Sequence, residues 1–384
     1  MIYYPVIIPT LNRFEHFKKC VESLLQCTHA EKTEIVIGLD FPPKEHYKNG
    51  YLKIKEYIPT IKGFLKVTLF EHQHNLGAIK NEQFLRDYAF QHYDAYIATE
   101  DDNIFSPAFL DYMNKALNAY KNNQNVAFVC AYSYPIIWEN KENVFLQHQY
   151  FSAWGFGEWK DKCLKMEKDF TTDYLGHYLE NHHNRQELFK LSEKLYRYAT
   201  VFSMLNKMPF HDAARCIYMA ISRQNTLMPR ISLVRNIGWD GSGLNCPLKY
   251  KEEFENQVLN ENKTFDLNDI TNAPIIESEN LEIYQQEFMG DFPHYKIIAD
   301  EIYMLLGKYG YHKAKSIYLN RRDFQSNVQV LKIKYKKENA LNLKELAPKM
   351  AGLTLKQKMC LFFSKNKILW CFFNFIGNIR FWKK

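Results

Sequence analysis

The sequence has no two cysteines at Cys-x-x-Cys spacing, although it contains eight cysteines in 384 residues. That absence argues against a zinc ribbon or a thioredoxin-like redox site. Scattered cysteines in a chain of this length are typical of buried thiols in a reducing compartment. The sequence also lacks internal repeats, and its first residues lack the basic and apolar regions of a signal peptide. We expect a β-strand to begin within these first residues.

Strong charge is absent from most of the chain. The formal net charge is +7, with 24% charged and 46% hydrophobic residues, which is ordinary for a soluble globular protein. Residues 331–384 hold 13 Lys and Arg against 2 Asp and Glu, so the rest carries a small negative excess. A nucleic-acid binder usually shows a basic surface on its folded body. We therefore expect no nucleic-acid partner.

Short apolar runs alternate with helical stretches over the first 130 residues. The expected strands are Tyr3–Ile8, Glu34–Leu39, Val67–Phe70, Ala95–Thr99 and Val126–Ala131, and the expected helices are Phe14–Leu25, Asn81–Phe90 and 107–120. This alternation predicts βαβ units and an α/β fold with a mostly parallel sheet flanked by helices. Ligands of such sheets bind at the carboxyl ends of the strands. The residues that directly follow each strand are therefore the candidate site.

Three adjacent carboxylates follow the fourth expected strand. Glu100, Asp101 and Asp102 repel one another, and a divalent cation would turn that repulsion into ligation. Magnesium or manganese bound by one or two carboxylates commonly takes substrate phosphates as further ligands. The alternative is a solvated acidic turn that caps the next helix. Spacing alone leaves both interpretations open.

Five segments together resemble a known family. They are PVIIPTLNR at 5–13, HNLGAIKN at 74–81, ATEDDN at 98–103, SAWGFGEWKD at 152–161 and PRISLVRNIGWDGSG at 229–243. In this order they are similar to bacterial glycosyltransferases of the GT-A fold, in particular the family 2-like sugar transferases of surface-polysaccharide synthesis. The resemblance covers about two-thirds of the chain. It implies a GT-A-type (Rossmann-like) catalytic domain over residues 1–250.

The resemblance also implies a division of the chain. Residues 1–130 would bind the nucleotide sugar, and residues 131–250 would form the acceptor half. Beyond the resemblance, the residue pattern itself predicts a polar, irregular segment over residues 251–295 and a helical C-terminal region over residues 296–384.

The same resemblance implies roles for residues on the donor side. The residues expected to contact the nucleotide sugar are Pro9, Thr10, Asn12, Arg13, Asp40, Asn75, Gly77, Lys80, Glu100 and Asp101. Arg13 would lie near phosphate or base, and Asp40 would bind base or ribose. The acidic run would be the DxD-type element, with Asp102 as the ligand of Mn²⁺ or Mg²⁺. Relatives end the glycine-rich loop with a metal-ligating His, where this chain has Asn245.

On the acceptor side, Trp154 and Gly155 match the Trp/Gly-rich segment of the family, and Glu158, a polar residue within this aromatic stretch, would contact an acceptor hydroxyl. Inverting transfer needs a general base for the acceptor's proton. Asp212 is the first candidate, since it lies where the family often has a Trp-Asp pair, and Asp240 is the second. Asp212 is also a plausible helix N-cap, and the tryptophans of this segment also suit a core.

The C-terminal tail, residues 356–384, interleaves lysines with aromatic residues. Its longest charge-free stretch begins at Ile368 and is too short to span a bilayer, which needs about 20 residues. The composition favours a helix on an anionic membrane surface, with packing on the protein as the alternative.

We therefore expect a metal-dependent, inverting hexosyl- or N-acetylhexosaminyl-transferase, cytoplasmic and peripheral on the inner face of the membrane. Its donor would be a nucleotide sugar, UDP-linked by default, and its acceptor a saccharide or a lipid-linked saccharide. The alternatives are a degenerate transferase acting as a membrane-bound assembly subunit and a sugar nucleotidylyltransferase.

Overall fold

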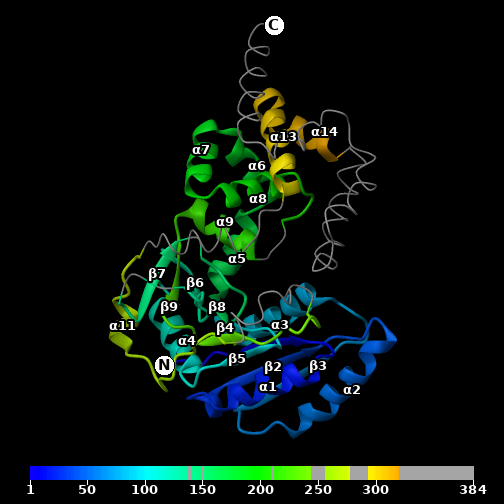
Figure 1. Ribbon diagram of the computed structural model, residues 1–384, viewed down its shortest axis with the longest axis vertical. Helices are drawn as coiled ribbons and strands as arrows, with labels where there is room; N and C mark the ends of the chain where they lie inside the picture. The colour runs from blue at the N-terminus through cyan, green and yellow to red at the C-terminus, as the bar shows by residue number, and fades with distance from the viewer. Residues whose placement is uncertain are drawn as a thin grey trace. The chain divides into compact units, whose positions relative to one another are not determined.

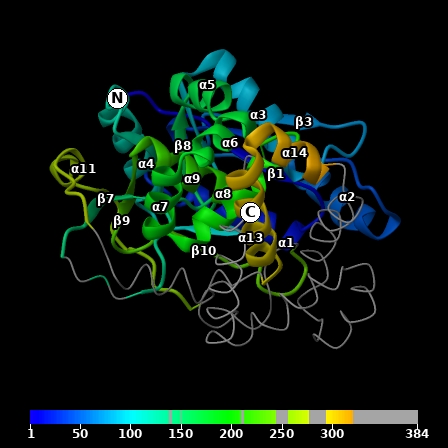
Figure 2. The same cartoon turned by 90° about the horizontal axis from the view of Figure 1, so that it is seen from above.

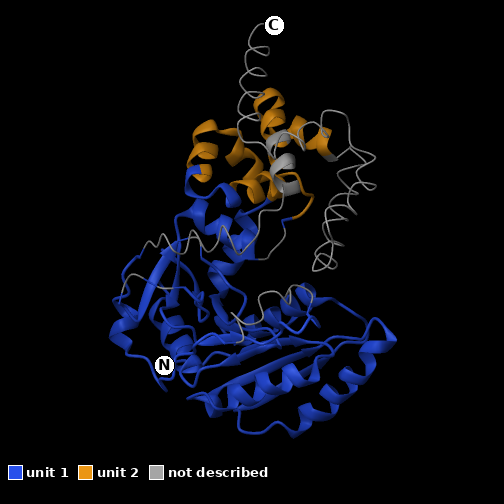
Figure 3. Ribbon diagram, in the orientation of Figure 1, with its two compact units in different colours: residues 1–171, 190–195, 208–290 blue, residues 172–189, 196–207, 291–384 orange. Residues whose placement is uncertain are grey.

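The computed structural model describes residues 1–136, 138, 141–148, 150–208, 212–243, 256–276 and 293–319. The chain divides into two compact units, coloured separately in Figure 3. The first unit is residues 1–171, 190–195 and 208–290, and the second is residues 172–189, 196–207 and 291–384. Segments between 172 and 207 group with the end of the chain. The expected catalytic, irregular and C-terminal regions stay predictions.

The first unit is built on an eight-stranded sheet. Its strands are β1 (Val6–Thr10), β2 (Glu34–Leu39), β3 (Lys66–Glu71), β4 (Ala95–Ala98), β6 (Val126–Cys130), β7 (Val144–His148), β8 (Phe156–Trp159) and β9 (Asn225–Pro229). They lie in the order β3-β2-β1-β4-β8-β6-β9-β7. A separate two-stranded sheet pairs β5 (Asn103–Phe105) with β10 (Val234–Asn236) in antiparallel fashion.

Strands β3, β2, β1 and β4 run parallel, and β8 runs antiparallel between β4 and β6. The chain therefore moves outward from β1 to β3 and then returns to place β4 on the other side of β1. The point between β1 and β4 where the order reverses is where doubly wound sheets bind ligands. It places the ends of β1 and β4 side by side.

Helices cover the sheet and connect its strands. Those of the first unit are α1 (Phe14–Leu25), α2 (Lys48–Tyr57), α3 (Ala78–His92), α4 (Phe109–Ala119), α5 (Lys160–Asp169), α9 (Asp212–Ser222) and α11 (Leu267–Thr271). Short 3-10 turns at Ala30–Lys32, Glu45–Tyr47 and Ile58–Thr60 join these elements. Figure 1 shows α3 on one face of the parallel strands and α1 with α2 on the other. That arrangement follows from right-handed crossovers that first move outward and then return. Helix α11 lies beside β7 in both Figure 1 and Figure 2.

The core of the first unit explains why these segments are strands and helices. The residues of β2 are buried along its whole length, as expected for a central strand covered on both faces. Helix α1 buries one apolar side, Phe17, Cys20, Val21 and Leu24, against the core. In β3 most residues are only partly buried and Lys66 is exposed, which suits an edge strand. The expected α/β class with a largely parallel sheet is confirmed.

The second unit is helical in its described part. Its helices are α6 (Thr172–Glu180), most of α7 (His182–Leu191) and of α8 (Glu193–Ser203), α13 (Pro293–Tyr309) and α14 (Tyr311–Leu319). Tyr311 packs against Gly176, where a Cβ would lie 2.0 Å from its ring. Its hydroxyl donates to Asp173 at 2.7 Å. A side chain at position 176 would therefore separate α6 from α14.

Several expectations fall outside the described residues, namely Asn245, residues 251–255 and 277–292 of the expected irregular segment, and the basic tail 356–384. Among the described helices, none combines the length and the apolar character needed to cross a bilayer. The described cysteines form no disulfide.

Candidate functional site

The loops after β1, β2 and β4 meet at the carboxyl edge of the parallel strands. The amide of Asp40, directly after β2, donates to the carbonyl of Thr10 at 2.9 Å. The Thr10 hydroxyl in turn donates to Oδ2 of Asp101, after β4, at 2.7 Å. The register of the three parallel strands brings these ends together, as the sequence predicted for this edge.

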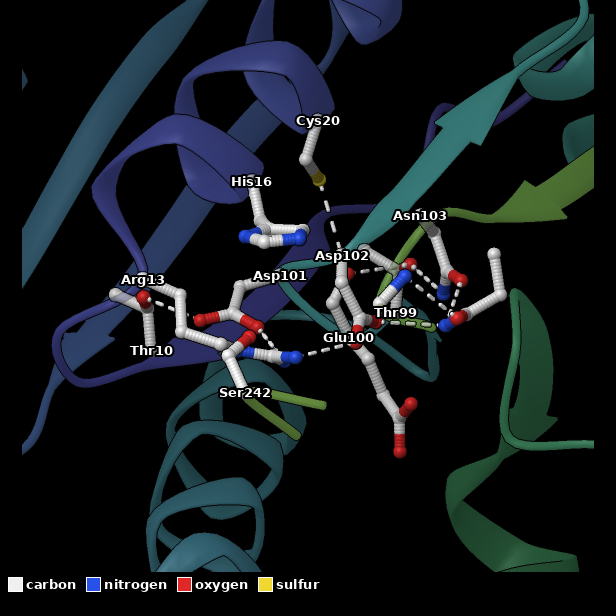
Figure 4. Close-up of polar contacts among 12 residues, drawn as sticks. Thr10, Arg13, His16, Cys20, Thr99, Glu100, Asp101, Asp102, Asn103 and Ser242 are labelled. Carbon is white, nitrogen blue, oxygen red and sulfur yellow. Dashed lines mark hydrogen bonds and ion pairs between the residues drawn. The ribbon is translucent and has the colours of Figure 1, made fainter. Parts of the chain in front are cut away.

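Arg13 pairs with two of the three adjacent carboxylates. Its Nη1 lies 2.6 Å from Oδ2 of Asp102, and its Nη2 contacts Oδ1 of Asp101. Figure 4 shows the guanidinium between the two aspartates. Desolvation lowers the pKa of Arg13, but the charges of Asp101 and Asp102 outweigh it and raise the pKa overall. The guanidinium is therefore charged at every ordinary pH.

The small β5–β10 sheet closes the other side of Asp102. Asn236, paired with Asn103 across this sheet, donates from Nδ2 to Oδ1 of Asp102 at 2.7 Å. The chain then passes directly over the carboxylate at Gly238, where a Cβ would lie 2.0 Å from Oδ2 of Asp102. Asp102 is only 2% exposed as a result. Desolvation raises its pKa, and the attraction of Arg13 only partly offsets that.

Glu100 points elsewhere. Figure 4 shows its carboxylate directed away from the guanidinium of Arg13. Oε2 of Glu100 accepts a hydrogen bond from the indole Nε1 of Trp154 at 3.0 Å. Desolvation and then the charges of Asp102 and Asp212 raise the pKa of Glu100 to about 8. The expected nucleotide-contacting residue Glu100 and the expected acceptor-side residue Trp154 thus form one contact.

Asp212 lies on the Trp154 side of the site. It is the first residue of α9, and its Oδ2 accepts a weak hydrogen bond from the amide of Ala153 at 3.4 Å. Desolvation raises its pKa, while the charge of Arg215, one turn along the same helix, lowers it. Its charge also acts on Glu100. The fold therefore brings together Asp212, the 153–154 segment and Glu100, which are far apart in sequence.

Asp240 has a different environment. Its side chain is 41% exposed and lies 3.3 Å from Nε2 of His16 in α1. Its Oδ1 accepts from the amide and the hydroxyl of Ser242 at 2.9 and 2.6 Å. Desolvation opposes these hydrogen bonds, but they prevail and lower the pKa of Asp240. A carboxylate stabilised in this way is a weaker base than Asp212.

Asp40 holds the loop that precedes α3. Its Oδ1 accepts from the amides of Phe41 and Leu76, and its Oδ2 accepts from the amide of Gly77 and from Nδ2 of Asn75, all at 2.8 to 3.0 Å. Gly77 has φ +78°, a conformation that glycine adopts without strain. Both carboxylate oxygens of Asp40 therefore accept hydrogen bonds from the chain's own groups. Its expected contact with base or ribose stays a prediction.

Three further residues were expected to contact the nucleotide sugar, namely Pro9, Asn12 and Lys80. Pro9 lies within β1, and Asn12 packs its backbone against Gly50 of α2. Lys80 is exposed on the first turn of α3. The expected contacts of these residues with a nucleotide sugar stay predictions.

Gly155 and Glu158 lie toward the interior of the first unit. Gly155 has φ +75°, and a Cβ there would lie 2.8 Å from Val234, so packing already requires glycine. Glu158 in β8 is 1% exposed and faces Arg215 at 4.0 Å. The nearby Trp159 is fully buried and belongs to the core.

A shallow depression lies beside Glu158 and Arg215. It is lined by Ile79, Glu82, Gln83, Arg86, Glu158, Cys163, Met166, Glu167 and Arg215, and its enclosed part has a volume of about 10 Å³. That is room for about one water molecule.

The carboxylates after β4 do not fit a divalent cation as they stand. Within the described residues, no three His, Cys, Asp or Glu side chains converge on a point that could hold a metal. Both oxygens of Asp102 accept from protein donors, Arg13 and Asn236. The role of Asp102 as a metal ligand stays a prediction, and the geometry of its carboxylate does not support it.

Sequence reasoning missed four residues that shape this site: His16, Arg215, Asn236 and Gly238. Asn236 and Gly238 lie in the quoted segment at 229–243, so the resemblance located them without assigning a role. Nothing in the sequence marked His16 or Arg215, because their partners, Asp240 and Glu158, are brought to them only by the fold.

No family model and no curated protein matches the chain. Among solved structures it is similar to a mannosyltransferase from Pyrobaculum calidifontis in complex with GDP-Man and Mn²⁺, at 17% identity and a TM-score of 0.30 over 43% of this chain and 46% of that one. It is also similar to TarS of S. aureus, at 11% identity and a TM-score of 0.37 over 79% of this chain and 49% of that one.

Mouse xyloside xylosyltransferase 1 in its apo form gives 7% identity and a TM-score of 0.28 over 43% and 69% of the two chains. The chain spans about half the length of the first two. Two of these structures, the mannosyltransferase and the xylosyltransferase, are sugar transferases by name. Likeness this low decides neither donor, acceptor nor metal.

Proposed function

We propose that the chain is a glycosyltransferase that moves a sugar from a nucleotide-sugar donor to a hydroxyl group of a saccharide or lipid-linked acceptor. One observation carries the proposal: the loops after β1, β2 and β4 converge with β10 at the switch point of the sheet. Sheets of this class bind nucleotides at such a point. Three of the five segments quoted from the sequence, 5–13, 98–103 and 229–243, supply the loops after β1 and β4 and the strand β10.

The donor would lie along this edge, near Arg13 and the loop that Asp40 anchors. Backbone and side-chain groups of Asn75, Gly77 and Lys80 would line the cleft for the nucleotide sugar. A UDP-sugar is the default donor, and the transferred group would be a hexose or an N-acetylhexosamine. The resemblance implied a divalent cation as well. Because the carboxylates do not fit one as arranged, we assign no step to a metal.

Asp212 would act as the general base. The acceptor hydroxyl loses its proton to the Asp212 carboxylate while its oxygen attacks C1 of the donor sugar, and the nucleoside diphosphate leaves from the opposite face with inversion. Two observations favour Asp212 over Asp240. Its pKa is raised where that of Asp240 is lowered, and it contacts the segment of Trp154. A base whose pKa is shifted toward neutrality transfers protons more effectively.

The protein would work in the cytoplasm, peripheral on the inner face of the membrane. The basic aromatic tail at 356–384 would attach it there, close to a lipid-linked acceptor. We propose no nucleic-acid partner. The second candidate function is a catalytically degenerate assembly subunit, which the protein donors on both oxygens of Asp102 favour.

The test is a transfer assay with purified protein and a panel of UDP- and GDP-sugars, with polyprenyl-linked and free saccharide acceptors. Transfer by the wild type should fall by about 10²- to 10⁴-fold in Asp212→Asn, the usual contribution of a general base. Asp240→Asn is the matched control and should retain most activity. Circular dichroism establishes that both variants fold. Equal turnover of Asp212→Asn and wild type would remove Asp212 from the mechanism.

If no donor binds or reacts under any condition, the assembly-subunit alternative takes the place of the enzyme. The anomeric configuration of the product, read by NMR, separately decides between inversion and retention.

A further inference from the structure

The four carboxylate oxygens of Asp101 and Asp102 all accept hydrogen bonds from the protein. Arg13 donates to Oδ1 of Asp101 and to Oδ2 of Asp102. Thr10 donates to the other oxygen of Asp101, and Asn236 to the other oxygen of Asp102, each at 2.7 Å. These donors come from β1, the loop that follows it, and β10. The acidic pair is therefore the centre of a hydrogen-bonded cluster that joins these three segments.

The carboxylate oxygens of this cluster are not accessible to a hydrated divalent cation. Magnesium needs about six oxygens at roughly 2.0–2.1 Å in a regular octahedron. Arg13 stands 2.6 Å from Oδ2 of Asp102, and the backbone of Gly238 covers the same oxygen. An ion bound to Oδ2 would also lie against the positive charge of the guanidinium. Repulsion between these two cations would oppose its binding.

Displacing Arg13 would be unfavourable as well. Its side chain is only 19% exposed, and its partners are 7% and 2% exposed. Removing one partner from a buried ion pair leaves the other charge uncompensated, which strongly destabilises the fold. An incoming cation would thus have to replace Arg13 and also leave a partly buried guanidinium without its partners.

We propose that Arg13 occupies the place of the divalent cation in this chain. The Asp101–Arg13–Asp102 cluster excludes Mn²⁺ and Mg²⁺, and a nucleotide diphosphate at this edge binds without them. The guanidinium has five N–H hydrogens, more than the two carboxylates use, so it can also donate to phosphate. The statement about the diphosphate rests on the proposed function. The statement about the cation does not.

The first experiment measures Mn²⁺ binding to the full chain without nucleotide, by electron paramagnetic resonance of the free ion. We expect no saturable site in the wild type below millimolar Mn²⁺, and no change in Asp102→Asn. In Arg13→Gln the freed carboxylates should bind Mn²⁺ at least about 10-fold more tightly, the scale on which neighbouring groups tune metal affinity. Adding Asp102→Asn to Arg13→Gln should abolish that gain.

The proposal is overturned if the wild type binds Mn²⁺ tightly and Asp102→Asn abolishes that binding. It is also overturned if Arg13→Gln folds but binds Mn²⁺ no more tightly than the wild type. Arg13→Lys is made in parallel, because it keeps a cation but not the two-pronged contact. It should gain less affinity than Arg13→Gln. If Arg13→Gln does not fold, the wild type and Asp102→Asn still decide the question.

The second experiment measures UDP and GDP binding by equilibrium dialysis in EDTA and in Mn²⁺. A nucleotide that binds should do so with the same affinity within about threefold in both, since uncoupled ligands show no linkage. Binding that needs Mn²⁺ overturns the proposal. If neither nucleotide binds in either buffer, the proposed function fails instead, while the Mn²⁺ titration still tests the exclusion of the cation by Arg13.

Discussion

Gly238 leaves no room for a side chain over Asp102. A Cβ at Gly238 would lie 2.0 Å from Oδ2 and 2.8 Å from Cγ of Asp102, and 3.1 Å from Nη1 of Arg13. Contacts under 3.0 Å force a movement of the neighbouring atoms. Here the neighbour is a carboxylate held on both oxygens. The glycine thus keeps β10 close to the turn after β4.

Gly238→Ala should therefore damage the site. Forcing a methyl group into packed surroundings costs about 1–3 kcal/mol of unfolding free energy, and the shift of Asp102 should break its pairing with Arg13. We expect a lower midpoint in chemical denaturation and weaker nucleotide binding than in the wild type.

Gly307→Ala in α13 is the matched control for this change. A Cβ there meets nothing within 4 Å. Alanine is a better helix former than glycine by about 1 kcal/mol, so this variant should be as stable as the wild type or more so. Equal stability of Gly238→Ala and wild type would mean that β10 is free to move away from Asp102.

Asp40 should matter more for the order of its loop than for global stability. In Asp40→Asn, an NH2 group replaces one of the two accepting oxygens of the carboxylate. One or two of the N–H donors that bonded to that oxygen would then be left unsatisfied. A fully buried unsatisfied donor costs about 1–3 kcal/mol. These donors are half-buried or exposed, so water can satisfy some of them and the cost should be smaller. We expect faster proteolysis within residues 72–77 and weaker donor binding, measured by mass spectrometry of the fragments and by dialysis. Lys80→Gln, next to the loop but exposed, should leave the proteolysis rate unchanged.

Much of the first unit could be predicted from its sequence. The apolar run Glu34–Leu39 was predicted as a strand with the bounds that β2 has, and Phe14–Leu25 as a helix with the bounds of α1. Both patterns are strong because one is buried throughout and the other presents a single apolar side. Helix α2 was missed. Its sequence contains Gly50, whose place is explained only by the tertiary contact with the backbone of Asn12.

The sequence identified individual residues of the site, but it did not predict which of them contact one another. Arg13 and Asp102 were both named, one for the nucleotide and one for a metal. Their mutual contact depends on the register of β1 with β4 and on a three-residue strand, β10, too short to give a pattern. A separation of 89 positions along the sequence says nothing about whether the two charges meet.

Arg215 should be a strong determinant of stability. Its guanidinium lies 4.7 and 4.8 Å from the rings of Phe151 and Phe156, and 4.0 and 3.6 Å from Glu158 and Glu82. Arg215→Met would leave Glu158 buried without a compensating charge, at a cost of about 3–5 kcal/mol. Urea denaturation should show this loss as a lower midpoint.

A double variant, Arg215→Met with Glu158→Gln, distinguishes the loss of the ion pair from the loss of side-chain packing. Replacing Glu158 by Gln in the Arg215→Met background removes the uncompensated carboxylate, so it should restore part of the lost stability. Arg235→Met in β10 is the control for loss of an arginine. Its Nε donates to the carbonyl of Gln257 at 2.7 Å, and among the described residues it pairs with no carboxylate. Additive effects of the two substitutions at 158 and 215 would show that the charges do not interact.

Glu100 should make the stability of the fold depend on pH. Desolvation and the charges of Asp102 and Asp212 raise its pKa to about 8, whereas the unfolded chain releases that proton near the usual value of 4.5. Between these values the folded protein holds a proton that the unfolded chain lacks. Stability must then fall as pH rises from about 4.5 to about 8, and the contribution of Glu100 is complete only below that window.

Glu100→Gln cannot release a proton, so its melting temperature should fall less than that of the wild type between pH 5 and pH 8. Each kcal/mol of the difference corresponds to roughly 2–4 °C for a domain of this size. Scanning calorimetry of both proteins over this range measures it. Glu45→Gln is the control, because the side chain of Glu45 is 82% exposed, and its curve should follow the wild type. Parallel curves for wild type and Glu100→Gln would place the proton on another group.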